Sequence, residues 1–428
     1  MLQPGDRVAV RTEKETIEGI LIPSPAKEIV VLKLDSGYNI GIKRVRIKRM
    51  RLIRRSKRAR VAPPRTPRRV PGLPTIAILH TGGTIASRVD YRTGAVVARF
   101  SPAELLELFP ELRGIANIRS RFLFQMFSED IEPEHWAAMA RAVRQELATG
   151  AEGVIVTHGT DTLHYSSAAL AFMLQDLRAP VLFVGAQRSI DRPSSDAFVN
   201  LLAAAQFIAK TDWAGVGVCM HRTPGDDSCL IHPGTKVRKM HSSRRDAFAT
   251  INASPIAEVW PDGRLSFFVK GYTKRGTDLP RLETRFERAV ALVKLHPGFD
   301  HALLDWHARR GIKGLVLEGT GLGHAPITAL DRWTARHPAL LKKLAELVRR
   351  GALVVMTSQC LYGAINMHVY STGRDLLAAG VLPGGDMTPE TAYVKLGWLL
   401  GNRPRQAAAL IGKNLVGEIS ARLELTSG

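Results

Sequence analysis

The strongest constraint on the fold is an alternation of short apolar runs with helical stretches that begins at Pro74. Runs of strand length occur at 75–79, 153–156, 181–184, 289–293, 314–317 and 353–356. Between them, 133–147 and 338–350 have the apolar spacing of helices. Such an alternation predicts an α/β fold in which a parallel sheet carries helices on both faces. The polar segment 271–283 divides this part of the chain into a larger and a smaller α/β domain.

The first 73 residues differ from the rest. Short alternating runs at 7–10, 16–22 and 29–32 are separated by glycine and proline, which predicts a small antiparallel barrel. Prolines mixed with arginines follow and indicate a linker. The predicted division is a small β-barrel over 1–55, a basic proline-rich linker over 56–73, an α/β domain over 74–270, a linker over 271–283 and a second α/β domain over 284–428.

Positive charge is concentrated at the N-terminal end. Of the formal net charge of +21, residues 1–70 supply +13, from 19 Lys/Arg against 6 Asp/Glu. Between Lys43 and Arg69 there are 14 basic residues and no acidic one. So dense a block of like charge either attracts a polyanion or forms a solvated linker, and the sequence leaves both interpretations open. The block lacks the aromatic residues with which nucleic-acid modules stack on bases.

Composition narrows the class of protein. Hydrophobic residues make up 45% and charged residues 23% of the 428 residues, as in ordinary globular proteins. No apolar run is long enough to span a bilayer, and the N-terminus does not resemble an export signal. The three cysteines, Cys219, Cys229 and Cys360, predict no disulfide framework, so we expect a cytoplasmic protein without membrane contact. No zinc-ligand spacing occurs, and we expect no metal site.

Two polar clusters follow strands of the larger α/β domain. Thr81-Gly82-Gly83-Thr84 follows the first strand, and the segment from Thr157 to Thr162 follows the second. Ligands of open α/β sheets bind beyond the carboxyl ends of the strands. Each cluster alone could be a helix cap, since threonine and aspartate are good caps. Two such clusters on parallel strands of one domain predict a functional site.

Two other motifs are weaker. His158 could be a general base or a packed residue that orients its loop, and we favour the second interpretation. His164, six residues later, does not form a helical metal pair with it. The segment from Gly319 to Gly323 has the glycines of a dinucleotide loop without the GxGxxG spacing, so a tight backbone turn is the better interpretation.

The two clusters carry a family resemblance. Thr81-Gly82-Gly83-Thr84-Ile85-Ala86 and His158-Gly159-Thr160-Asp161-Thr162 resemble the two signature motifs of the L-asparaginase/glutaminase family, and the likeness extends over 74–428. Within that family, the preceding barrel and the stretch from Val237 to Phe248 are most similar to the GatD-type subunits of archaeal glutamyl-tRNA(Gln) amidotransferases. The resemblance implies a two-domain asparaginase-like α/β fold preceded by a small all-β SH3-like barrel.

The resemblance also implies roles for individual residues. Thr84 matches the threonine nucleophile, with Thr160 a competing candidate for the first attack. Tyr91 matches a tyrosine on the loop that closes over the substrate and hydrogen-bonds that threonine. Asp161 and Lys239 match the acid and the lysine that serve Thr160. A threonine hydroxyl is a weak nucleophile until a base takes its proton, and a lysine held away from water can act as that base.

Substrate contacts are implied in the same way. The expected residues are Gly83, Ser128, Glu129 and Gly159. Many asparaginases carry glutamine where this chain has Glu129, and an acid there suits the ammonium group of an amino-acid substrate. Without the resemblance, Lys239 would be interpreted as a surface charge, because it lies in the basic stretch with Arg238, Arg244 and Arg245.

The function implied is the release of ammonia from the side-chain amide of glutamine or asparagine by a threonine nucleophile. A partner subunit of the GatE type would use the ammonia to convert Glu-tRNA(Gln) to Gln-tRNA(Gln), with ATP and Mg²⁺ bound at the partner and no cofactor in this chain. A homodimer of this chain within a heterotetramer is implied, with tRNA contacted mainly through the partner. The alternatives are a free-standing L-asparaginase of amino-acid catabolism and a non-catalytic binding module that works through the basic segment.

Overall fold

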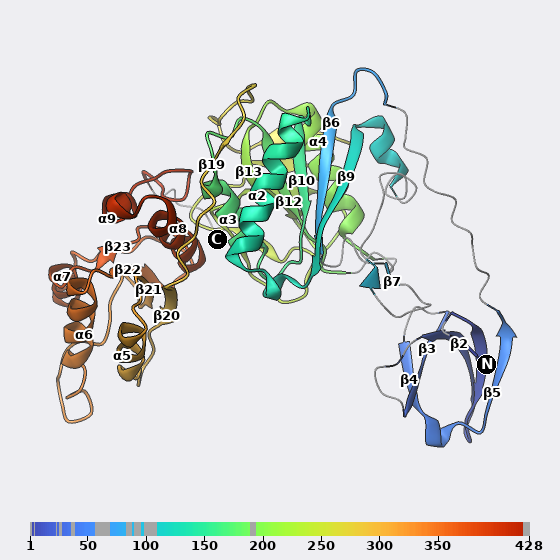
Figure 1. Ribbon diagram of the computed structural model, residues 1–428, viewed down its shortest axis with the longest axis horizontal. Coiled ribbons are helices and arrows are strands. Elements are labelled where there is room, and N and C mark those ends of the chain that lie inside the picture. Colours follow the sequence, from blue (N-terminus) through green and yellow to red (C-terminus); the bar gives the residue numbers. More distant parts are fainter. Residues whose placement is uncertain are drawn as a thin grey trace.

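A computed structural model describes most of the chain. The described residues are 2–3, 5–22, 24, 28–35, 39–55, 69–82, 88–89, 96–97, 109–188 and 194–422. Within them, an all-β unit precedes two α/β units, which confirms the predicted fold class (Figure 1). None of the helices described is long and apolar enough to cross a membrane.

The N-terminal unit is a five-stranded antiparallel sheet in the order β4-β3-β2-β1-β5. Its strands are β1 (Arg7–Arg11), β2 (Thr16–Ile22), β3 (Ile29–Lys33), β4 (Asn39–Lys43) and β5 (Arg49–Arg54), and the 3-10 turn η1 (Arg44–Arg46) connects the last two. Alternate residues such as Val8, Val10 and Leu32 fill a small core. Strand β5 lies inside the basic block between Lys43 and Arg69, so 49–54 belong to the sheet and are not a solvated linker. Residues 56–68 lie outside the described part of the chain.

The larger α/β unit contains an eight-stranded sheet in the order β18-β17-β14-β13-β12-β10-β6-β9. The parallel strands are β6 (Thr75–Gly82), β9 (Asn117–Met126), β10 (Gly153–Thr157), β12 (Pro180–Val184) and β13 (Gly215–His221). The antiparallel edge consists of β14 (Cys229–Pro233), β17 (Ala257–Val259) and β18 (Leu265–Phe267). The predicted parallel sheet therefore carries an antiparallel edge that the sequence did not predict, because a short hairpin connection after β13 reverses the chain.

Helices cover both faces of this sheet, as predicted (Figure 1). The helices are α2 (Pro133–Ala148), α3 (Leu163–Met173) and α4 (Ala197–Lys210). Strand residues alternate between two cores: Ala77 and Leu79 pack with residues of α2 and α3, whereas Ile76 and Ile78 pack with residues of α4. The period of two in a buried strand thus places one core on each side of the sheet.

The smaller α/β unit has a four-stranded parallel sheet in the order β20-β21-β22-β23. Its elements are β20 (Val290–Lys294), α5 (Ala302–Arg309), β21 (Gly314–Gly319), α6 (Pro338–Arg349), β22 (Leu353–Ser358), α7 (Ser371–Ala378), β23 (Leu382–Pro383), α8 (Pro389–Asn402), η5 (Pro404–Gln406) and α9 (Ala407–Leu410). Helix α8 contacts α3 of the larger unit, where Trp398 stacks on Phe172 with the ring centroids 5.4 Å apart. A buried ion pair, Lys236 with Asp386 at 2.5 Å, also joins the two units.

Short elements complete the fold. They are the ribbon of β7 (Arg88–Val89) and β8 (Val96–Val97), the 3-10 turns η3 (Pro110–Gly114) and η4 (Ser128–Asp130), the pair of β11 (Leu174–Gln175) with β19 (Arg281–Leu282), and the hairpin of β15 (Val237–Lys239) with β16 (Phe248–Thr250). The segment 271–283, which we predicted to be a linker, contains the strand β19, which pairs with β11 of the larger unit.

Candidate active site

The two polar clusters leave the sheet at the same edge. Strands β6 and β10 are parallel neighbours, and Thr157 lies opposite His80. Nδ1 of His80 lies 3.1 Å from Oγ1 of Thr157, and the hydroxyl of Thr81 donates to the carbonyl of Thr157 at 2.9 Å. These contacts fix the ends of the two strands to each other. The carboxyl end of β6 is therefore held beside the loop that begins at His158.

A lysine contacts both Thr160 and Asp161 of the second cluster. Nζ of Lys239 lies 2.8 Å from Oγ1 of Thr160 and 2.8 Å from Oδ1 of Asp161. Thr160 and the Lys239 side chain are largely buried, whereas the Asp161 carboxylate is 66% exposed. The structure thus brings Lys239 together with Thr160 and Asp161, and the 10% exposed Lys239 side chain is not a free surface charge.

Ser128 connects a third loop to this site. It follows β9 in the turn η4, and its buried hydroxyl oxygen accepts the backbone N–H of Asp161 at 3.2 Å. Its carbonyl accepts the hydroxyl of Thr162 at 2.5 Å. Glu129, the next residue, is exposed. Of the predicted substrate contacts, Ser128 therefore lies against the loop that carries Thr160, and Glu129 follows it in the same turn.

Two glycines allow these close approaches. A Cβ at Gly159 would lie 2.9 Å from Cβ of Ser128, so any side chain there would push the two loops apart. A Cβ at Gly185, the residue after β12, would lie 2.7 Å from Cγ2 of Thr160. Sequence reasoning found Gly159 in a motif but missed Gly185, whose requirement follows only from the packing of β12 beside β10.

His158 packs inside the loop. Its Nδ1 lies 2.6 Å from the carbonyl of Gly159, and its Nε2 lies 2.8 Å from the hydroxyl of Ser166 on α3. Burial lowers the pKa of His158 to about 4, although the backbone contact opposes the shift. The ring is therefore neutral at pH 7 and orients the loop, as we predicted.

His164 lies in the first turn of α3, buried beside Tyr165 with the ring centroids 4.8 Å apart. Its Nδ1 is buried without a hydrogen-bond partner among the described residues. Burial and the positive charge of Arg238 lower its pKa to about 3. A neutral ring next to the lysine hairpin adds no positive charge to the site.

The hairpin that carries Lys239 is fixed from the smaller unit. Arg238 forms an ion pair with the buried Glu390 of α8 at 3.0 Å. Sequence reasoning assigned no role to either residue, because they are 152 positions apart and Arg238 lies in a basic stretch. The pair ties the strand that presents Lys239 to the neighbouring unit.

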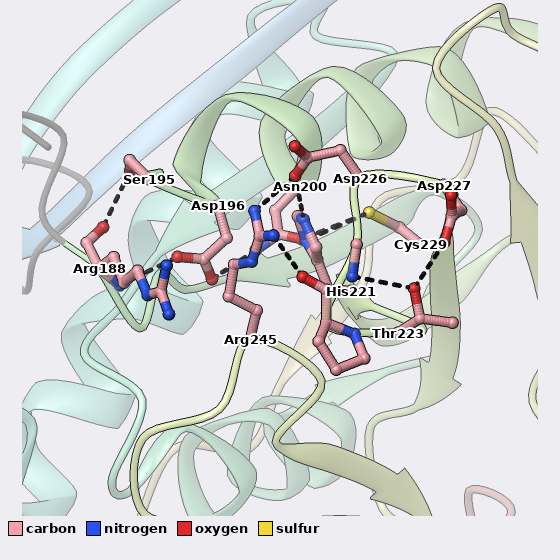
Figure 2. A network of polar contacts seen from close by, with 12 residues as sticks. Arg188, Ser195, Asp196, Asn200, His221, Thr223, Asp226, Asp227, Cys229 and Arg245 are labelled. Carbon is pink, nitrogen blue, oxygen red and sulfur yellow. Dashed lines mark hydrogen bonds and ion pairs between the residues drawn. The ribbon is translucent and has the colours of Figure 1, made fainter. Parts of the chain in front are cut away.

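A second contact holds the tip of the same hairpin (Figure 2). Arg245 forms an ion pair with Asp226 at 2.6 Å and donates to the carbonyl of Pro224. Asp226 and Pro224 belong to the turn between β13 and β14. The side chain of Arg245 is only 14% exposed. The tip of the β15–β16 hairpin is therefore bound to the tip of the β13–β14 hairpin.

His221, the last residue of β13, contacts the same Asp226 carboxylate (Figure 2). Its Nδ1 lies 2.6 Å from Oδ1 of Asn200, and its Nε2 lies 3.2 Å from the Asp226 carboxylate. The amide N–H groups of Asn200 donate to the carbonyl of Gly185 and to Asp196, so its oxygen must face His221. Both ring nitrogens thus meet acceptors, which favours the doubly protonated ring. Burial lowers the pKa of His221, but its contacts with Cys229 and Asp226 outweigh burial and raise the pKa.

Three predicted residues, Gly83, Thr84 and Tyr91, lie outside the described part of the chain. The glycine-rich segment after β21 forms the tight turn that we predicted, with Thr320 bridged to His324 and positive φ angles at Gly321 and Gly323. Within the part of the chain that the structure describes, no group of three or more His, Cys, Asp or Glu side chains is arranged to hold a metal ion.

Family models match all three units. Residues 2–53 match the GatD N-terminal domain, residues 75–270 the asparaginase N-terminal domain, and residues 289–409 the glutaminase/asparaginase C-terminal domain. Among solved structures, the thermostable L-asparaginase from Thermococcus kodakarensis is 34% identical, with a TM-score of 0.72, covering 81% of this chain and 100% of its own. L-asparaginase I from Vibrio cholerae is 26% identical, with a TM-score of 0.70 and coverage of 81% and 99%.

Curated relatives are similar over almost the whole length. The GatD subunit of the glutamyl-tRNA(Gln) amidotransferase of Pyrococcus abyssi is 46% identical, covering 97% of this chain and 94% of its own. The one of Pyrococcus furiosus is 48% identical, covering 95% of this chain and 92% of its own. The one of Methanothermobacter thermautotrophicus is 47% identical, covering 98% of this chain and 95% of its own. The chain therefore belongs to the GatD family of glutamyl-tRNA(Gln) amidotransferase subunits, whose members it matches in both the N-terminal barrel and the glutaminase/asparaginase domains.

Proposed function

We propose that this chain hydrolyses the side-chain amide of glutamine or asparagine with a threonine nucleophile and supplies the ammonia to a partner subunit. The observation that carries the proposal is Nζ of Lys239 placed 2.8 Å from both Oγ1 of Thr160 and Oδ1 of Asp161. A lysine between a hydroxyl and a carboxylate can take the hydroxyl proton while the carboxylate holds it in position.

The chemistry proceeds in two steps. A threonine oxygen attacks the amide carbon, its proton passes to the base, and the C–N bond breaks as ammonia leaves with a proton. Water then hydrolyses the threonine ester and releases the free acid. We assign the first attack to Thr84 by its motif, with Thr160 as the competing nucleophile. In support, β6 ends at Gly82 beside the loop of Thr160.

Substrate selection is assigned to the loops around Thr160. The Ser128 oxygen accepts the N–H of Asp161, and among the described residues its own proton has no acceptor, so it can donate to a substrate carboxylate. Glu129 is exposed next to it and can receive the substrate ammonium group. Backbone N–H groups at Gly83 and Gly159 are the proposed donors to the oxyanion, and Tyr91 the group that closes over Thr84.

The destination of the ammonia is proposed from the relatives. Their name marks each as one subunit of an amidotransferase, which implies partner subunits. We assign that role to a GatE-type subunit that binds ATP and Mg²⁺ and contacts most of the tRNA, in a cytoplasmic heterotetramer built on a homodimer of this chain. The second candidate is a free-standing L-asparaginase, which the likeness to two L-asparaginase structures favours. The match to those structures includes 81% of this chain and almost all of each L-asparaginase. The N-terminal barrel, in contrast, matches the GatD N-terminal domain, which favours the first candidate.

Ammonia release by the purified full-length protein tests the hydrolytic step. Thr160→Ala and Lys239→Met should each lower kcat by about 10²- to 10⁴-fold with glutamine or asparagine, the range of general acid–base catalysis. Lys274→Met is the matched control, because Lys274 pairs with Asp212 at 2.9 Å on the surface. Wild-type rates in either site variant would remove the catalytic assignment.

The destination has its own test. Ammonia release should rise when the partner subunit and Glu-tRNA are added. Equal rates with and without them would favour the free-standing asparaginase.

A further inference from the structure

The outward face of strands β1 and β5 in the N-terminal barrel carries an unusual pairing of arginines. The register places Arg11 opposite Arg49 and Arg51 opposite the small residue Ala9, and a register shift between Arg7 and Val8 places Arg54 opposite Arg7. Met50 and Leu52 alternate with these arginines and lie opposite the core residues of β1. The arginines therefore share the face of the sheet that the barrel core does not use.

The carboxylates near this face act on Arg7. Asp35 binds Arg7 in a two-point contact at 2.9 and 2.5 Å, which raises the pKa of Arg7. Glu18, which lies opposite Ala9 on β2, also raises the pKa of Arg7 through its charge. In the described part of the chain, Arg11, Arg49, Arg51 and Arg54 form no ion pair, and all four are exposed. We call these four side chains the arginine face. Like charges directly opposite each other on neighbouring strands destabilise a sheet, so the fold itself does not explain them.

Protection of an exposed sheet edge is the simplest alternative. Strand β5 is the last strand of its sheet, and charged residues on edge strands prevent pairing with other chains. Charged residues on β5 alone would protect this edge. Edge protection therefore does not explain Arg11, which lies on the neighbouring strand β1 and faces Arg49. The arginine face thus extends over two strands, as a surface for a bound anion would.

We propose that the arginine face binds the phosphate backbone of RNA. Residues two apart along a strand, such as Arg49 and Arg51, are separated by about 7 Å, and neighbouring strands by about 5 Å, so the guanidinium groups form a compact lattice of positive charge. Guanidinium groups bind phosphate oxygens in a two-point geometry. The four side chains include no aromatic residue to stack on bases, so they contact backbone and not sequence.

An RNA fits this face better than an acidic protein does. Protein interfaces are anchored by aromatic and apolar side chains and are depleted in charge at their centre. Here the centre is formed by arginines. Positive charge also continues along the chain to Arg69. Binding to RNA stands on this geometry alone; the choice of tRNA as the natural RNA depends on the proposed function.

Binding of a fluorescent tRNA transcript to the full-length protein over a range of salt concentrations tests the proposal. The triple variant Arg11→Gln/Arg49→Gln/Arg51→Gln should bind more weakly to every RNA sequence. The slope of log K against log[salt] should become shallower by about 2 to 3, close to one for each phosphate contact removed. Its ammonia release from glutamine without tRNA should stay at the wild-type rate, so failure of the hydrolytic proposal would be seen separately.

A matched control changes the same charge elsewhere. Arg309, Arg349 and Arg405 are exposed arginines of the smaller α/β unit, and their triple glutamine variant should keep the wild-type slope. Unchanged affinity and slope in the arginine-face variant, or an equal loss in the control, would overturn the proposal. Displacement of the RNA by polyglutamate at equal negative charge would also overturn it, because the face would then suit an acidic protein.

Discussion

The N-terminal barrel and the two α/β units use charged side chains in opposite ways. Around the candidate active site, charges meet a partner of opposite sign: Lys239 with Asp161, Arg238 with Glu390 and Arg245 with Asp226. On the barrel, Arg11 faces Arg49 across neighbouring strands. A charge that is paired within the chain fixes geometry. A charge that faces its own kind lowers the stability of the barrel and is available to an anion from outside.

The difference follows from burial. A buried ion must have a partner, because its removal from water costs several kcal/mol that only close contacts offset. An exposed arginine keeps its water and can be left unpaired at little cost. In the α/β units, paired charges fix loops and units to each other. On the barrel, the unpaired arginines lie on the surface. Substitutions of these two kinds of charge should therefore differ in the size of their effects.

Lys236→Met should destabilise the α/β units by about 3–5 kcal/mol, because it leaves the buried carboxylate of Asp386 without its counterion. Urea unfolding followed by tryptophan fluorescence measures the change. Lys294→Met, which removes an exposed lysine paired with Glu318 at 3.2 Å, is the control and should change the stability by less than about 1 kcal/mol. Equal losses in the two variants would contradict the distinction between buried and exposed pairs.

Acid should destabilise the larger α/β unit through a third kind of group, buried and uncharged. His158 has a folded pKa of about 4, below the ordinary value of 6.5, so between these values the unfolded chain binds a proton that the folded chain does not. The contribution of the neutral His158 to the free energy of unfolding is therefore fully present above pH 6.5. It is lost as the pH falls toward 4, which lowers the stability by about 3 kcal/mol. Urea unfolding of wild type and His158→Gln across this range checks the slope, which should be shallower in the variant. An identical slope would assign the acid sensitivity elsewhere.

Arg245→Gln should lower kcat for ammonia release by about tenfold, equivalent to about 1.4 kcal/mol, while KM changes less, because Arg245 positions the Lys239 hairpin without touching the substrate. Arg245→Lys, which can still reach Asp226, should restore part of the rate. Arg264→Gln, on another hairpin where Arg264 pairs with Asp262 at 2.7 Å, is the control. A rise in KM alone would show that Arg245 acts on binding and not on the hairpin.

Arg11→Thr should stabilise strand β1 by about 0.5 kcal/mol at low salt, since it removes one member of a like-charged cross-strand pair. Slower hydrogen exchange of β1 amides would show the gain, and added salt should reduce it. Arg7→Thr, which loses the contact with Asp35, should show no gain. Faster exchange in Arg11→Thr would mean that the arginine face supports the barrel.

Much of the architecture could be predicted from local patterns. The apolar run at 153–156 and the Pro133 start of a helix correspond to β10 and α2, because strand period and helix entry are properties of neighbouring residues. Strands β17 and β18 of the antiparallel edge were missed because they have only three residues each. A strand so short has too few positions to show its alternation.

The candidate site divides in the same way. Glycine and threonine after two strands predicted a site, and the family motifs gave Lys239 its place. The contact with Glu390 and the contact of Arg245 with Asp226 were not predictable, because each joins loops whose meeting depends on how the hairpins dock. Gly185 was missed for the same reason, since its close neighbour is Thr160 in the loop that follows another strand.

The sequence by itself determined the alternation of strands and helices, the two turns at the strand ends and the family to which the chain belongs. Only the tertiary structure decided which charges meet. Lys239 reaches Asp161 across 78 positions because β15 contacts α3, the helix that follows the loop of Asp161, and Arg11 faces Arg49 because β1 pairs with β5. A periodic pattern is local, whereas the environment of a charge is set by whatever the folded chain places beside it.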